Sequence, residues 1–364
     1  MASVTSRAPY DAPPVNPGPV TVTLDLRPAR QILALLGRTQ FDENEARAIE
    51  LLPAVQAAIR ESGRGRDVFE RDLAAAFDPQ ARITLYDFRR IRDDRSKWDD
   101  LLSQVATREA ELTKKISDRA RALLPAQPAA PATLPVSLTF GLPGRTDQLV
   151  APAPEGGERE QIIDLSRALA DLQNSAAPEQ IQHLTRLIAT EAYSRAWAAY
   201  RSTDAAWSRH DGALGQLEPL LRAVAEHGPV ALYGIDENFF PLATWLKEPM
   251  RSSLDDLNRV ADKLLSTEGD LDARVSLAAE VRRPDFATRV AGPAGAFLSD
   301  GIITSFGIDA YRAALASGPT AFFSWYDKAS RERGRELIPL SKAIKDRLAA
   351  VAGTAEPSPP GTKK

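Results

Sequence analysis

The stretch LIATEAYSRAW, residues 187–197, decides how the chain is expected to fold, because it follows a helical pattern yet carries a carboxylate on its apolar side. On a helix that turns 100° per residue, Glu191 falls in the middle of the apolar stripe that contains Leu187 and Ile188. Arg195 follows one turn later on the same side. One interpretation is an ion pair that tethers the helix. The alternative is a general base left from an active site.

Two hydroxyl residues flank this carboxylate, because Thr190 precedes Glu191 and Ser194 follows one turn after Thr190. In the zinc-peptidase motif H-E-x-x-H, two histidines at this spacing bind the metal and the glutamate between them activates a water. Here the glutamate is present and both histidines are replaced. Neutral hydroxyls are poor zinc ligands, so the motif alone indicates a degenerate site.

Composition excludes several classes of function. The chain has 364 residues, a formal net charge of −3 and no cysteine, so thiolate catalysis and cysteine zinc sites are ruled out. The charge gives no reason to expect a nucleic-acid partner, and no apolar run approaches the length of a membrane span. No signal peptide is visible at the start, so we expect a cytoplasmic protein. If a signal peptide was trimmed, the protein is secreted or periplasmic.

The pattern along the chain predicts a mainly helical fold with a small β-sheet, of the α+β class. Alternation with period two predicts strands at residues 20–26 and 136–140, and residues 161–166 fit either a strand or a helix start. Helical periodicity covers most of the rest, including a single run from Asp42 to Gly63 and the charged stretch at residues 86–124. Breaks are expected at Gly228-Pro229, Gly292-Pro293 and Gly318-Pro319.

Composition also predicts four parts of the chain. Residues 1–19 are rich in proline and predict a disordered arm, and residues 349–364 predict a disordered tail. The proline- and alanine-rich stretch at 125–135 is typical of a linker. We therefore expect an N-terminal subdomain over 20–130 and a second subdomain over 131–348.

Two further segments carry a resemblance to gluzincin-type zinc peptidases. AEHGPVALYG, residues 225–234, is similar to the segment of that group in which a helix brings the third zinc ligand just before a glycine. That position falls on Glu226 or His227, and a shift of one residue leaves the choice open. The segment at 292–329 resembles the C-terminal end of families described as zinc-dependent peptidases, with a Gly-Pro joint and an aromatic close at Phe322, Phe323 and Tyr326.

The resemblance implies a zincin-like fold over about residues 20–330 whose metal site is degenerate. The catalytic position is Glu191, and the former metal positions are Thr190, Ser194 and Glu226 or His227. With two ligands lost, we expect a catalytically inactive pseudo-peptidase that acts as a binding or scaffold module and holds no cofactor. The alternative is an active metallopeptidase or hydrolase with a non-standard site built on Glu191, and only that alternative requires zinc.

The expected partner is a protein or peptide whose identity the sequence does not give. Tyr193 and Tyr233 lie close in sequence to the degenerate positions and are candidates for lining a binding cleft. Trp197, Tyr200 and Trp207 cluster with Tyr193 near the same helix, and these four aromatic residues either line a binding cleft or, as is more common, belong to the core. The polar run in residues 233–246 is either a cleft rim or a cap for the helix that follows.

Overall fold

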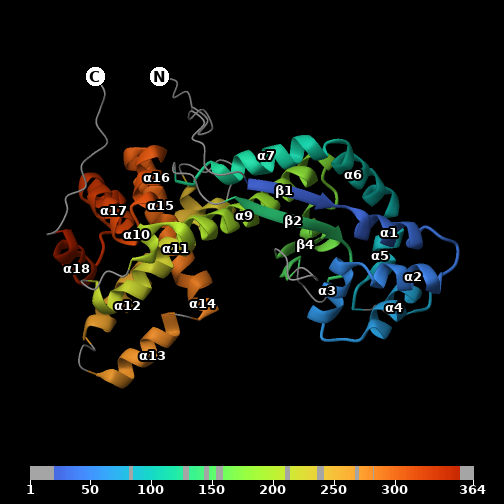
Figure 1. Ribbon diagram of the computed structural model, residues 1–364, viewed down its shortest axis with the longest axis horizontal. Coiled ribbons are helices and arrows are strands. Elements are labelled where there is room, and N and C mark those ends of the chain that lie inside the picture. The colour runs from blue at the N-terminus through green and yellow to red at the C-terminus, as the bar shows by residue number, and fades with distance from the viewer. Residues whose placement is uncertain are drawn as a thin grey trace. The chain divides into compact units, whose positions relative to one another are not determined.

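The computed structural model describes residues 20–352 except 82–84, 126–130, 143–146, 153–158, 210–213, 236–241, 267–269 and 282. The fold is mainly helical with one small mixed sheet, as the α+β prediction requires (Figure 1). The predicted arm at 1–19 lies outside the described residues. So do most of the predicted tail and the polar run at 236–241, although the last helix continues to Ala352. Among the helices described, none is both long enough and apolar enough to cross a membrane.

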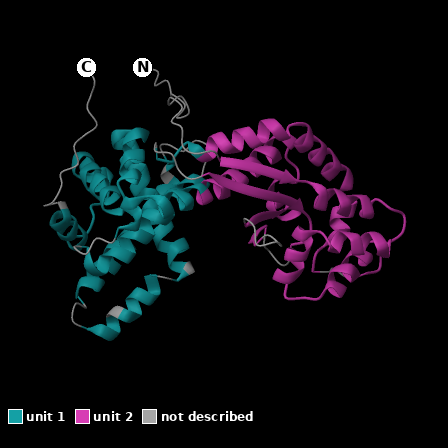
Figure 2. Ribbon diagram, viewed as in Figure 1, with its two compact units in different colours: residues 1–18, 121–130, 196–364 teal, residues 19–120, 131–195 magenta. Residues whose placement is uncertain are grey.

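The chain divides into two compact units (Figure 2). The sheet unit contains residues 19–120 and 131–195, and the helical unit contains residues 121–130 and 196–364. This does not follow the division predicted near residue 130. The reason is that strand β2, Ala132–Thr139, pairs in parallel with β1, Val20–Asp25, and so returns the chain to the N-terminal part.

The sheet has the strand order β1-β2-β4-β3. Strand β4, Glu160–Asp164, runs parallel to β2, whereas β3, Gln148–Ala151, forms an antiparallel edge. The predicted strand at 136–140 therefore begins earlier than expected. The stretch at 161–166, which fits either a strand or a helix start, contains both: β4 ends at Asp164, and the short helix α8, Leu165–Ala168, follows directly. The Asp164 carboxylate caps α8 by accepting the Ser166 N–H at 2.9 Å.

Helices pack on both faces of this sheet. The helices of the sheet unit are α1 (Arg27–Leu36), α2 (Glu43–Glu50), α3 (Pro53–Glu61), α4 (Arg66–Ala75), α5 (Phe88–Asp93), α6 (Arg95–Thr107), α7 (Glu109–Arg121) and most of α9 (Ala177–Thr203). Leu138 of β2 shares one small void with side chains of α6, α7 and α9. On the other face, Ile162 of β4 packs against Ala54 and Ala58 of α3.

The sequence predicts one helix from Asp42 to Gly63, but the structure has two helices there. The pattern from Asp42 to Gly63 forms α2 and α3, and α3 begins at Pro53. Proline lacks the N–H that would continue the α2 hydrogen-bond ladder, and it is well suited to the first turn of a new helix. The acidic residues of the pattern do start α2 as expected, since Asp42 accepts the N–H groups of Asn44 and Glu45.

The helical unit is built around α15, Gly292–Phe306, which is apolar on all sides and buried along most of its length. Of the predicted Gly-Pro breaks, the one at residues 318–319 begins helix α17, whereas Gly292-Pro293 stands within a helical run that is continuous from residue 284 to residue 306 and changes there from π to α. The third predicted break is also wrong, because Gly228-Pro229 lies inside α11. The elements around α15 are α10 (Ala205–Ser208), α11 (Glu218–Ile235), α12 (Thr244–Ser266), α13 (Leu271–Val281), α14 (Pro284–Phe286), η3 (Ala287–Ala291), α16 (Ile308–Ala316), α17 (Pro319–Arg333) and α18 (Lys342–Ala352).

Candidate functional site

The suspect carboxylate lies in α9 and is held by the arginine one turn later. Arg195 Nε donates to Glu191 Oε1 at 3.0 Å, as the helical pattern predicts. Most of each side chain is buried, with 24% of the Glu191 side chain and 16% of the Arg195 side chain exposed, as expected for a pair on the apolar side of the helix. Arg195 also donates to the Arg159 carbonyl. The Glu191 carboxylate therefore has a stable cationic partner within its own helix.

The two hydroxyl residues beside Glu191 lie in the same turns of α9. Thr190 donates its hydroxyl to the Arg186 carbonyl at 2.9 Å, and both Thr190 and Ser194 are half-buried. Such a bond back to the helix satisfies the hydroxyl locally. These residues belong to the sheet unit, and residues 226–227 belong to the helical unit. That Thr190 and Ser194 face Glu226 or His227 stays a prediction.

The carboxylate at the expected third-ligand position also has an arginine partner. Arg201 Nη1 lies 2.7 Å from Glu226 Oε1. The same guanidinium lies 5.5 Å from the centre of the Trp197 ring, and the Trp197 indole N–H donates to the Glu226 carbonyl at 2.9 Å. In the described part of the chain, no three acidic or histidine side chains come together as a metal would require.

The aromatic residues near this site belong to the core. Trp197, Tyr200 and Trp207 are buried, as predicted, and Trp197 packs edge-on against Trp207. Tyr193 and Tyr233, which we expected as candidates for lining a cleft, are also fully buried. Neither side chain reaches an open surface. The correction has a simple cause, since an aromatic ring on the inner side of a long helix buries a large apolar area.

The helical unit contains a pocket of about 890 Å³ on one side of α11. One face of α11 lines it with residues at spacings of three and four, among them Ala223, Glu226, His227 and Val230. Met250 of α12, Val281 of α13, the η3 segment and the first two residues of α15 complete the walls. The walls are mostly apolar, and the volume falls within the range typical of small-molecule sites.

A contact between two glycines brings α11 and α15 together beside this pocket. A Cβ atom added to Gly228 would lie 2.5 Å from the Gly295 backbone, and one added to Gly295 would lie 2.4 Å from the Val224 carbonyl. Only glycine allows such an approach. Gly228 is therefore present for helix packing, which explains why Gly228-Pro229 does not break α11.

One wall of the pocket is a π-helical turn, η3. Pro293 has no N–H to donate to the Arg289 carbonyl, so the ordinary α-helical ladder is interrupted between η3 and α15. The Ser253 hydroxyl of α12 lies 3.2 Å from that carbonyl and supplies a donor. Turns of this kind occur frequently at functional sites.

Two of the charges at the pocket are neutralised within the protein. Arg222 lies 3.2 Å from Glu218 and also donates to the carbonyls of Trp207 and Arg209. Glu226 is paired with Arg201. Arg283 differs, because its guanidinium is exposed and makes no hydrogen bond or ion pair with the residues that the structure describes.

His227 is the titratable group that opens into the pocket. Its side chain lines the pocket and keeps an exposed part, and desolvation of the buried part lowers the pKa of His227 below its ordinary value. The neighbouring Glu226 acts in the opposite direction, and Arg201 lowers the pKa further. The imidazole is thus neutral at pH 7 and can donate or accept a hydrogen bond there.

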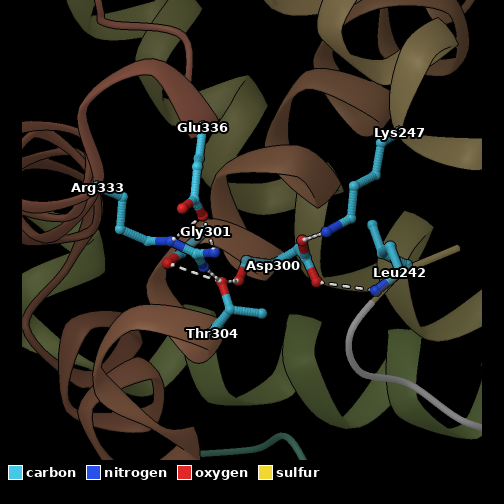
Figure 3. Close-up of polar contacts among 7 residues, drawn as sticks. All are labelled: Leu242, Lys247, Asp300, Gly301, Thr304, Arg333 and Glu336. Atoms are coloured by element: carbon cyan, nitrogen blue, oxygen red, sulfur yellow. Dashed lines mark hydrogen bonds and ion pairs between the residues drawn. The ribbon is translucent and has the colours of Figure 1, made fainter. Parts of the chain in front are cut away.

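A second polar cluster surrounds Asp300 of α15, which is only 3% exposed (Figure 3). Its carboxylate lies 3.1 Å from Lys247 Nζ and accepts the Leu242 N–H at 3.1 Å. Thr304 lies one turn after Asp300 in α15, and its hydroxyl accepts a hydrogen bond from Arg333 at 2.7 Å. Asp300 has partners on both of its oxygens, so the cluster ties α15 to the beginning of α12.

The sequence patterns did not reveal the pocket as a site. Its residues from α11 were visible as one face of that helix, but the opposing wall comes from segments at 250, 281–288 and 292–293 that no local pattern connects. The proline that interrupts the ladder before α15 was the one local signal. Comparison of the chain with protein-family models, with curated proteins and with solved structures gives no match.

Proposed function

We propose that the protein is a non-catalytic binding module, a degenerate relative of gluzincin-type peptidases that takes its ligand at the α11 pocket. The observation that carries this proposal is that Glu191 and Glu226 are each paired with an arginine. The resemblance implies that the base is Glu191 and that the third ligand is Glu226 or His227. A carboxylate oxygen that accepts a hydrogen bond from a guanidinium has fewer lone pairs to offer to a metal ion or to a water molecule.

The donor set does not fit zinc. A catalytic zinc site needs three protein ligands and a water. Thr190 and Ser194 offer neutral hydroxyls, and the Thr190 hydroxyl is already bonded to its own helix. The order of elements supports the resemblance, since β4 is followed by α9 with Glu191, then α11 with Glu226, then α15 to α17. On this proposal, the chain keeps the order of helices of such a peptidase but not its zinc ligands.

Elemental analysis of the purified protein tests this proposal. After dialysis we expect less than about 0.1 zinc per chain and no chelator-sensitive cleavage of unstructured peptides. Stoichiometric zinc, with cleavage that is lost in Glu191→Ala, would instead establish the active metallopeptidase. Cleavage that survives chelators but is lost in the same variant would establish a metal-independent hydrolase.

A gain-of-site variant sharpens the test. Thr190→His with Ser194→His places two imidazoles at i and i+4 on one face of α9, the arrangement that zinc requires. We expect this double variant to bind zinc more tightly than the parent chain. The matched control is Thr190→His with Ala198→His, whose spacing of eight residues does not close around one ion. Equal zinc affinity in the two double variants would contradict the proposed origin of the site.

A further inference from the structure

We infer that the α11 pocket binds an apolar carboxylate, a molecule with a hydrocarbon body of about ten to fourteen carbons and one anionic head. This inference rests on the proposed binding function and names its ligand class. It is drawn from three properties of the described residues, namely the lining of the pocket, the balance of its charges and the π-helical wall.

The lining calls for a hydrocarbon body. Pro219, Val230, Met250, Val281 and Pro293 face a volume of about 890 Å³. A ligand that removes these side chains from water gains roughly 25 cal/mol for every Å² of apolar surface that is buried. Several of the lining residues are alanine, glycine or proline. Their side chains are short, so the pocket has room for a hydrocarbon chain rather than for a single small ring.

The charge balance calls for an anionic head. Arg222 and Glu226 are each neutralised by a partner inside the protein, so neither attracts a ligand charge. The remaining cation at the pocket is Arg283, which has no counter-ion among the described residues. A planar guanidinium binds a carboxylate with two parallel hydrogen bonds, and apolar surroundings strengthen that contact.

His227 supplies a second polar contact on the α11 side. Its ring opens into the pocket from α11, whereas Arg283 approaches from the segment between α13 and η3. A neutral imidazole can donate one hydrogen bond to a carboxylate oxygen, and a carboxylate in turn favours the protonated ring. A neutral head of the same size gains much less from these two groups.

Isothermal titration calorimetry with dodecanoate, dodecanol and butyrate at pH 8, below the aggregation limit of each, tests the inference. We expect dodecanoate to bind one per chain and at least about tenfold more tightly than dodecanol, while butyrate, which carries the head alone, gives no measurable binding. Equal affinity for dodecanoate and dodecanol would overturn the anionic head. Absence of binding by both would overturn the ligand class.

Variants locate the binding. Arg283→Gln should weaken dodecanoate about tenfold and leave dodecanol unchanged. Arg289→Gln is the matched control, since it removes an exposed arginine from the same segment that does not line the pocket, and it should change neither affinity. Equal weakening by both variants would mean that the head is attracted by surface charge alone and would overturn the assignment to Arg283.

Two further variants test the hydrocarbon body. Ala287→Trp and Val230→Trp each place a large ring into the pocket from opposite walls, and both should abolish binding of dodecanoate and dodecanol. Unchanged binding in a variant whose circular dichroism matches the parent chain would overturn the site. The zinc and peptidase assays above are independent of these titrations, so the failure of one proposal is distinguishable from the failure of the other.

Discussion

At the scale of single residues, Glu191 and Glu226 are each paired with an arginine. The pairing of Glu191 with Arg195 follows from their spacing on one helix, which is why it could be predicted from sequence. The pairing of Glu226 with Arg201 could not, because it joins residues from two helices whose packing no local pattern defines. The identity of the pocket residues around His227 was hidden for the same reason.

Glu191→Ala should lower the free energy of unfolding by about 1 kcal/mol. The pair is partly exposed and lies at i and i+4, so its own contribution is modest, and the variant also leaves Arg195 without its partner. Urea denaturation of the full chain measures the change. Glu191→Gln, which keeps the shape and one acceptor, should cost less. A loss of 3 kcal/mol or more would show that Glu191 is tied to further groups.

His227 should make the protein less stable as the pH falls below about 6.5. Its pKa is lowered in the folded protein, so the unfolded chain takes up the proton first, and the stability present above pH 6.5 is lost as the pH falls toward the folded pKa. The comparison is thermal unfolding of the parent chain and His227→Gln between pH 8 and pH 5.5. The variant should lose a smaller part of its stability over that range.

The control for this comparison is His183→Gln, which removes a histidine whose ring contacts Arg186 in α9. Its pH profile should follow that of the parent chain more closely than the profile of His227→Gln does. Parallel profiles for the parent chain and His227→Gln would contradict the role assigned to His227.

At the scale of elements, close packing decides features that propensity suggested differently. A glycine before a proline is typical of a break. At Gly292-Pro293 the helix changes from π to α without a break, whereas Gly318-Pro319 does begin a helix. Gly228-Pro229 does not, because the distance between α11 and α15 needs a residue without a side chain. A sequence shows that a glycine is present, but whether a turn or a neighbouring backbone requires it depends on the tertiary fold.

Gly228→Ala should destabilise the protein by about 1–3 kcal/mol, the usual cost of inserting atoms into a packed contact. Gly295→Ala should act in the same direction, since its added Cβ meets the Val224 carbonyl. The matched control is Gly234→Ala in the same helix, where the glycine is exposed and alanine has the higher helix propensity. That variant should be neutral or stabilising in urea denaturation. A change in the free energy of unfolding of the same sign for Gly228→Ala and Gly234→Ala would contradict the close contact.

Asp300→Ala should cost about 3–5 kcal/mol, because it leaves the Lys247 ammonium and the Leu242 N–H without their buried acceptor (Figure 3). Asp300→Asn should cost less, since an amide oxygen still accepts the N–H. Adding Lys247→Met to Asp300→Asn should recover part of the loss. A double-mutant cycle with no coupling between the two positions would contradict the pairing.

At the scale of the whole molecule, the fold class could be predicted and the division of the chain could not. Periodicity identified helices and two of the strands, and it left β4 open between a strand and a helix start, because it is a local property. The composition of the proline-rich stretch at 125–135 predicts a domain boundary, yet β2 begins within it at Ala132 and pairs with β1. Composition shows where a chain can be extended, and it does not show whether the extended segment enters a sheet.

The parallel pairing of β1 with β2 has a consequence for biosynthesis. Val20 meets Ala132, so about 110 residues must leave the ribosome before the first strand has its neighbour. At about 5–20 residues per second, β1 waits for roughly 6–22 s with its apolar residues Val20 and Val22 unprotected. A nascent chain arrested at residue 131 should therefore be digested rapidly by protease and be held by chaperones. A chain arrested beyond residue 230, with the sheet unit outside the tunnel, should resist digestion, and equal resistance in the two would show that β1 is protected earlier.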